Sequence, residues 1–204
     1  MSKRSELVNI FKTYQIEYEQ VKDEIKRIRE NKSRAYSDEG IRMMLNDTTN
    51  RFSNISIQYR DRAISIIDDG IKMLENKWKE NSVGRLNDSS YQIGLANTIK
   101  MIETGSISNR EDFKNIIDAY KNDYNALAII KNLVNADGDK LALIDLLPSD
   151  TREYNKKILR DLKNNINRFI NPLNIDDDYV ELSLISMREF VENKFDENLE
   201  VMNS

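Results

Sequence analysis

The sequence contains no cysteine and no histidine, and only six glycine and two proline residues among its 204. Without cysteine a disulfide framework is impossible, and without both residues the usual zinc, haem and Cys/His-nucleophile sites are excluded. So few glycines and prolines leave few of the turns that a β-rich fold requires. These absences favour a helical protein without thiolate or imidazole chemistry.

Long hydrophobic runs and an excess of positive charge are also missing. Apolar runs such as Leu141–Ile144 are far shorter than the roughly 20 residues of a membrane span. Residues 1–6 have no apolar core behind their charges, so we expect no secretory signal. The formal net charge is −4, whereas nucleic-acid binding relies on positive charges that neutralise phosphates. We therefore expect neither a membrane nor a nucleic acid as partner.

Two stretches of regularly spaced apolar residues predict long helices, from about residue 5 to 31 and from about residue 38 to 79. Both show the alternating 4-3 spacing of a coiled coil. The first seam consists of Leu7, Phe11, Tyr14, Tyr18, Val21, Ile25 and Ile28. The second consists of Ile41, Leu45, Thr48, Phe52, Ile55 and Tyr59. A turn near Tyr36 would bring Tyr14 opposite Tyr59, so we predict a long antiparallel coiled-coil hairpin over residues 1–80.

Shorter amphipathic segments follow a polar boundary at residues 81–90 and predict a compact bundle over residues 89–147. Ser108–Glu111 has the form of a capping box, Asp123 is a typical helix cap, and Leu141–Leu147 predicts a short apolar helix. The predicted fold class is therefore all-α, with a long antiparallel coiled-coil hairpin plus a compact bundle of shorter helices.

Residues 149–204 predict two C-terminal helices. The first runs from Asp150 to about Ile170, and its inward residues are Tyr154, Ile158, Leu162, Ile166 and Phe169. The second is capped by Asp176, and its apolar stripe is Val180, Leu184, Met187, Val191, Phe195, Leu199 and Met202. That stripe is long and coil-like, so we expect this last helix to cover part of the hairpin.

Two acidic stretches raise the question of a metal site. The run that begins at Asn135 resembles the start of a calcium loop, but its sixth and twelfth positions are Lys140 and Leu146 instead of Gly and Glu. Residues 176–178 are three consecutive aspartates, which point in different directions on a helix and serve better as caps. No phosphate loop or nucleophile motif occurs. We expect no catalytic residue, no metal, no cofactor and no enzymatic activity.

Two charged faces are candidates for binding a partner. The residues Arg152, Lys156, Arg160 and Lys163 recur at 4-4-3 spacing and form one basic face of a predicted helix. Residues 176–200 hold nine acidic and two basic side chains, among them Glu189 and Glu192. Solvated faces of this kind are common, so each is either a binding surface or ordinary solvent-facing charge.

Three segments between residues 97 and 134 resemble part of a known group of proteins: Asn97–Glu103, Asp112–Tyr120 and Asn122–Lys131. They are similar to a segment of small helical proteins that are encoded in the structural-gene modules of tailed phages of Gram-positive bacteria. Those proteins similarly join a charged N-terminal coiled coil to a compact segment. The resemblance implies a virion or assembly protein, head-associated or scaffold-like, that resides in the host-cell cytoplasm or the virion.

The leading hypothesis is thus a non-enzymatic phage protein that acts through helical surfaces. Its expected partner is a capsid-type protein or a second copy of itself, in a homo-oligomer. The alternative is an inhibitor that blocks a host enzyme or defence complex, with the acidic residues 176–200 mimicking nucleic acid. A hydrolase that uses carboxylates and a metal is a third and weaker alternative.

Overall fold

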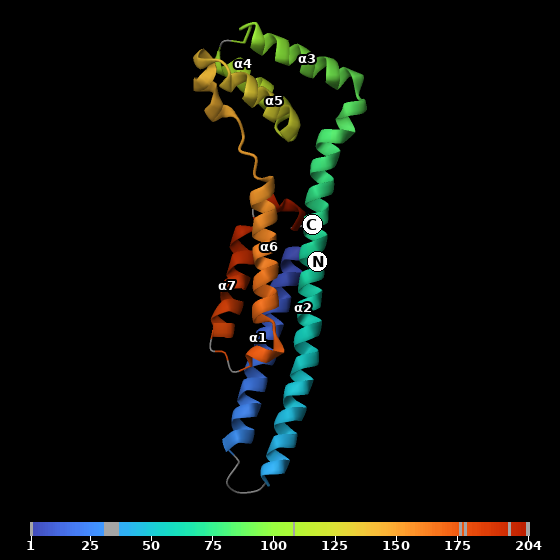
Figure 1. Ribbon diagram of the computed structural model, residues 1–204, viewed down its shortest axis with the longest axis vertical. Coiled ribbons are helices and arrows are strands. Elements are labelled where there is room, and N and C mark those ends of the chain that lie inside the picture. Colours follow the sequence, from blue (N-terminus) through green and yellow to red (C-terminus); the bar gives the residue numbers. More distant parts are fainter. Residues whose placement is uncertain are drawn as a thin grey trace. The chain divides into compact units, whose positions relative to one another are not determined.

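The computed structural model describes residues 2–30, 37–107, 109–175, 177, 179–195 and 197–202 (Figure 1). All regular elements in these ranges are helical and none is a strand, which confirms the all-α prediction. The α-helices are α1 (Lys3–Glu30), α2 (Asp38–Val83), α3 (Ser89–Glu103), α4 (Arg110–Tyr120), α5 (Tyr124–Asn135), α6 (Arg152–Phe169) and α7 (Tyr179–Lys194). Short 3-10 helices are η2 (Gly84–Asn87), η3 (Gly138–Leu146), η4 (Pro172–Asn174) and η5 (Glu197–Met202).

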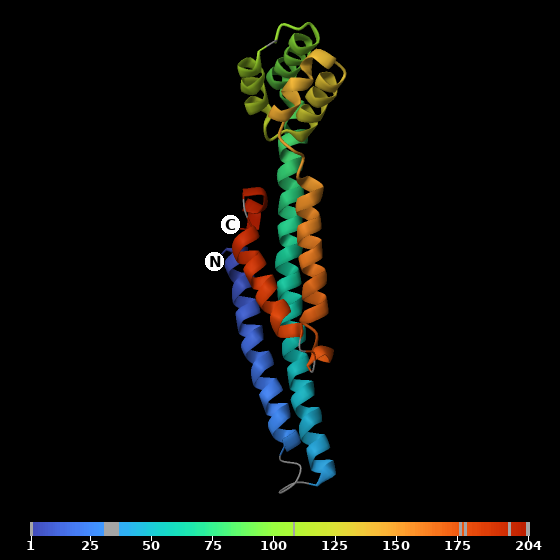
Figure 2. The same cartoon turned by 90° about the vertical axis from the view of Figure 1, so that its left-hand side faces the viewer.

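The chain forms two compact units. The first contains Met1–Lys72 and Glu153–Ser204, and the second contains Met73–Arg152. We call them the terminal unit and the middle unit. In the terminal unit α7 lies beside α1, and α6 lies beside α2 (Figure 2).

Helices α1 and α2 meet through aromatic side chains. The ring of Tyr14 stacks on Phe52 and meets Tyr59 edge-on, with centroids 5.8 Å apart in both pairs. The predicted opposition of Tyr14 and Tyr59 is therefore observed as a ring contact. Between Phe52 and Tyr59 on α2, the buried residue is Ser56 instead of the predicted Ile55, and its hydroxyl shares a hydrogen bond of 3.2 Å with the Tyr14 hydroxyl.

The predicted last stripe is buried along its whole length, from Val180 to Met202. The predicted single helix is wrong, however, because α7 ends at Lys194 and the chain continues as η5. The end of η5 folds onto α2, where the sulfur of Met202 occupies the space that a Cβ on Gly70 would need. The predicted cap at Asp176 lies outside the described residues.

Helix α6 buries a face that differs slightly from the predicted one. Its buried residues are Asn155, Leu159, Leu162 and Ile166, followed by Ile170 just beyond the helix. The predicted Tyr154 is 64 % exposed, because the helix is rotated by about one residue from the orientation that its aromatic residues suggested. Ile158 and Phe169 consequently lie at the edge of the buried face.

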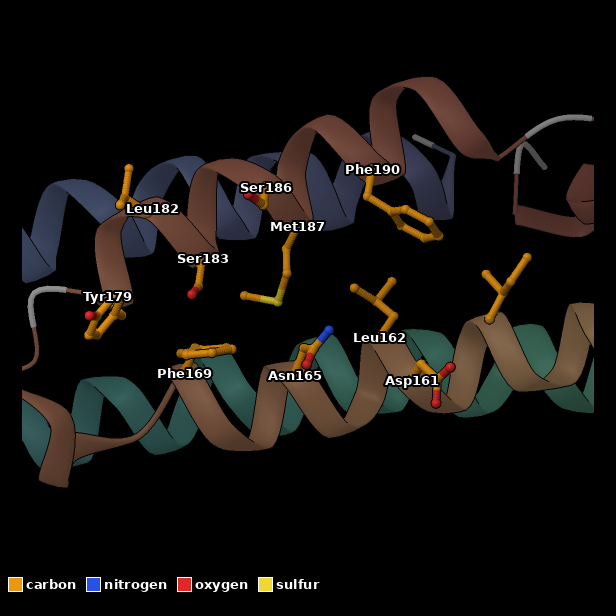
Figure 3. A pocket seen from close by; sticks show the side chains of 11 residues that line it. Asp161, Leu162, Asn165, Phe169, Tyr179, Leu182, Ser183, Ser186, Met187 and Phe190 are labelled. Carbon is orange, nitrogen blue, oxygen red and sulfur yellow. The ribbon is translucent and has the colours of Figure 1, made fainter.

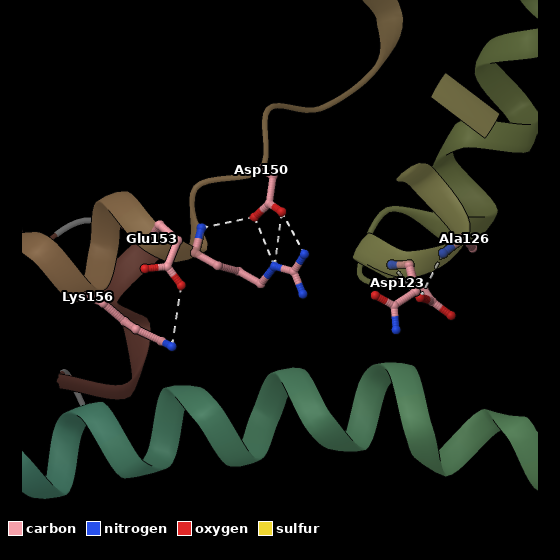
Figure 4. A network of polar contacts seen from close by, with 7 residues as sticks. Asp123, Ala126, Asp150, Glu153 and Lys156 are labelled. Atoms are coloured by element: carbon pink, nitrogen blue, oxygen red, sulfur yellow. Dashed lines mark hydrogen bonds and ion pairs between the residues drawn. The ribbon is translucent and has the colours of Figure 1, made fainter. Parts of the chain in front are cut away.

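The middle unit has a core of its own. It comprises Ile102, Ile107, Phe113, Ile117, Tyr120, Ala126, Leu127, Ile130, Val134 and Leu143. Asp123 caps α5 as predicted, since its carboxylate accepts hydrogen bonds from the backbone N–H groups of Asn125 (3.0 Å) and Ala126 (3.1 Å) (Figure 4). Helix α4 is capped by Asn109, one residue later than predicted, and Ser108 lies outside the described residues. Residues 141–146 of the helix predicted at 141–147 form the end of the 3-10 helix η3, and Leu147 lies beyond it.

Candidate functional site

A groove lies between α6 and α7, within the terminal unit. It has a volume of about 440 Å³. Figure 3 shows its lining side chains along the two helices, with Phe169 and Tyr179 at one end and Leu162 and Phe190 at the other. The lining residues are Ile158, Asp161, Leu162, Asn165, Phe169, Tyr179, Leu182, Ser183, Ser186, Met187 and Phe190.

The groove has apolar side chains at both ends, polar side chains in the middle and one carboxylate at the Phe190 end. Asn165 of α6 and Ser183 and Ser186 of α7 contribute amide and hydroxyl groups between the two apolar ends (Figure 3). Asp161 is the charged side chain among the lining residues, and it lies at the end near Phe190. Such a lining offers apolar burial and a few hydrogen bonds to an occupant, but no obvious nucleophile or acid–base pair.

One end of the groove exposes two large apolar side chains to solvent. Tyr179 is 72 % exposed and Leu182 is 64 % exposed. The guanidinium of Arg168 lies over the ring of Phe169 at this same end, 5.0 Å from the ring centroid. Single exposed apolar residues are ordinary on a protein surface, whereas a cluster beside a groove is typical of an interaction site.

Three of the four residues of the predicted basic face form ion pairs with carboxylates of the same chain. Lys163 bonds to both carboxylate oxygens of Asp68 on α2, at 2.7 and 2.8 Å, and Lys156 pairs with Glu153 at 3.5 Å. Arg152 pairs with Asp150 at 2.6 Å (Figure 4), and these hydrogen bonds lower the pKa of the Asp150 carboxyl.

Arg160, the remaining member of the basic face, is exposed. A partner would therefore have to compete with carboxylates of the chain for the other three side chains. Whether Arg152, Lys156, Arg160 and Lys163 bind a partner stays a prediction.

The two predicted acidic residues of α7 differ in their surroundings. Glu192 pairs with Lys12 of α1 at 3.5 Å, and its carbonyl oxygen accepts a hydrogen bond from Arg4. Glu189 is exposed and directly precedes Phe190 of the groove. Glu192 thus contributes to the contact of α7 with α1, whereas Glu189 lies at the end of the groove where Asp161 lies.

The run from Asn135 forms a turn in which Asp137 pairs with Lys140 at 2.7 Å, and the same ammonium donates to the carbonyl oxygen of Ile102 at 2.6 Å. Among the residues that the structure describes, no group of three or more acidic side chains could hold a metal ion. In the same part of the chain, no helix combines the length and the apolar character that crossing a membrane requires.

Sequence reasoning did not find the groove. Three of its residues are apolar but lie off the predicted stripe of the last helix: Tyr179, Leu182 and Phe190. These additional apolar residues were the feature of the sequence that could have indicated a second apolar surface on this helix. Comparisons with protein-family models, with curated proteins and with solved structures gave no match for this chain.

Proposed function

We propose that this protein is a non-enzymatic virion or assembly protein of a tailed phage, head-associated or scaffold-like, that acts through helical protein–protein surfaces. The observation that carries the proposal is the groove between α6 and α7. Its apolar ends and the solvent-exposed Tyr179 and Leu182 beside it are the kind of surface that accepts a helix. The resemblance of residues 97–134 to phage structural-gene proteins supports the proposal that this is a phage protein.

We propose further that α1 and the first part of α2 form a long antiparallel coiled coil, which holds the groove on a stiff support. Three contacts support this arrangement, because their partners run in opposite directions along the two helices. Glu6 pairs with Arg62 at 2.7 Å, Tyr14 meets Tyr59, and Glu24 accepts a hydrogen bond from Thr48 at 3.0 Å. Phe52→Asp should unfold or strongly destabilise this support, whereas the same change at the more exposed Ile57 should be mild.

The experiment that tests the proposed function is affinity purification of the tagged chain from phage-infected cells, followed by mass spectrometry. We expect capsid-type proteins, and we expect Leu182→Asp to reduce their recovery while the circular dichroism spectrum stays helical. Asn167→Asp is the matched control, because Asn167 is exposed on α6 and does not line the groove. Recovery of a host nuclease or defence complex would instead support the inhibitor hypothesis, and recovery of neither would contradict the proposal.

A further inference from the structure

Two oppositely charged side chains of α6 lie towards the two ends of the groove between α6 and α7. Asp161 lines the groove at the end near Phe190 (Figure 3). Arg168 does not line the groove, but its guanidinium lies over the ring of Phe169 at the other end. Both belong to α6, seven positions apart, which corresponds to about 10 Å along the helix axis. Asn165 lies almost midway between them and lines the polar centre of the groove.

The apolar side chains also differ between the two ends of the groove. One end exposes Tyr179 and Leu182 to solvent, while the other end is lined by Ile158, Leu162 and Phe190. A two-fold axis through the groove centre, perpendicular to α6, would place each end of the groove against the opposite end of the groove of a second copy, so that residue i contacts residue j and j contacts i. The opposite charges at the two ends would then face each other.

We propose that the occupant of the groove is a second copy of this chain, docked through the same α6–α7 surface about a two-fold axis near Asn165. Asp161 of each copy then faces Arg168 of the other, so that the interface contains two equivalent ion pairs. Tyr179 and Leu182 of each copy cover the Ile158–Phe190 end of the other groove. This inference rests on the proposed function and deepens it: the helices that occupy the groove are those of a second copy, and the dimer is the form that binds capsid-type proteins. Leu182→Asp should therefore reduce their recovery by breaking the dimer.

The charge pattern favours this occupant over an unrelated helix. An unrelated amphipathic helix would need its own matching order of charges, whereas a second copy supplies the matching charges in the required antiparallel order. Complementary charges of this kind fix the register and suppress wrong pairings.

The first experiment is sedimentation analysis of the full chain with charge exchanges on α6. Asp161→Arg alone places two arginines together at each end, and Arg168→Asp alone places two carboxylates together. Each single change should raise the dimer dissociation constant at least about tenfold, and the double variant D161R/R168D should restore it. Asn167→Arg is the matched control and should leave the dimer unchanged. A wild-type chain that stays monomeric, or single changes without effect, or a double variant that is not rescued, would each overturn the proposal.

A second experiment uses the absence of cysteine from the sequence. Asn165→Cys introduces one thiol at the proposed axis, where it should lie against its own copy and form an interchain disulfide under mild oxidation. Asn167→Cys provides a thiol on the same helix away from the groove and should cross-link far more slowly. Equal cross-linking of the two variants would exclude an axis at Asn165. Dimerisation without capsid-type partners in infected cells would contradict the proposed function alone, whereas a monomeric wild type would contradict this inference alone.

Discussion

The hydroxyl groups of Tyr14 and Ser56 lie 3.2 Å apart and share a hydrogen bond inside the contact between α1 and α2. Both side chains are completely buried. The pair explains why a small polar residue occupies a core position of α2, since a buried phenol without a partner costs free energy and a larger apolar residue would displace the ring.

Ser56→Ala should lower the free energy of unfolding by about 1–3 kcal/mol, because it removes the hydrogen-bond partner of a buried hydroxyl. Urea denaturation followed by circular dichroism measures this loss. Adding Tyr14→Phe to the alanine variant removes the orphaned hydroxyl and should recover part of the stability. Ser53→Ala on the same helix is the control, and an equal loss at both serines would show that the Tyr14 contact is not responsible.

Alkaline pH should destabilise the protein through the same tyrosine. Burial raises the pKa of Tyr14 to about 12, whereas an unfolded tyrosine has a pKa of about 10. The folded chain therefore keeps a proton that the unfolded chain loses, so this contribution is complete below about pH 10 and is lost as the pH rises towards 12. Burial raises the pKa of Tyr91 as well, with its hydrogen bond to Asp123 adding to the effect.

The measurement is the free energy of unfolding of the wild type and of Tyr14→Phe at several pH values between about 9 and 12. We expect the wild type to lose stability more steeply than the variant, in which Tyr59 and Tyr91, whose pKa values are also raised by burial, still contribute to the slope. Parallel curves for the two proteins would contradict a buried and protonated Tyr14.

The positions of the helices could be predicted from the spacing of apolar residues, because burial on one helix face imposes that spacing. All seven predicted residues of the first seam are buried in α1. The cap at Asp123 could also be predicted, because an unpaired backbone N–H at a helix start needs a nearby acceptor.

The remaining features depend on how helices are placed against each other. The burial of Asn155 instead of Tyr154 follows from the rotation of α6, which the periodicity fixes only to within about one residue. The groove depends on the separation of α6 and α7, and no spacing within one helix encodes that distance. The intrachain ion pair of Lys163 with Asp68 joins residues far apart in the sequence. The sequence alone therefore could not show that Lys163 of the basic face is already paired within the chain.

Gly70→Ala should destabilise the terminal unit by at most about 2 kcal/mol, because the overlap of the added methyl group with the sulfur of the buried Met202 costs about 1–3 kcal/mol and the better helix propensity of alanine returns about 1 kcal/mol. A double-mutant cycle with Met202→Ala isolates the contact. The glycine substitution should cost much less when Met202 is already truncated. Gly138→Ala is the control, because nothing lies within 4 Å of a Cβ at that position. Additive effects at residues 70 and 202 would show that the end of η5 does not rest on Gly70.

Asp123→Ala should destabilise the middle unit by about 2 kcal/mol, because one carboxylate has two tasks there. One oxygen accepts from the N–H groups at the start of α5, and the other accepts from the hydroxyl of Tyr91. Asp123→Asn keeps an oxygen for the cap but loses the second acceptor, so it should fall between the wild type and the alanine variant. Thermal unfolding measures the total loss, and hydrogen exchange at Asn125 and Ala126 reports the cap itself. The exposed Asp118→Ala is the control, and an equal loss there would argue against both tasks of Asp123.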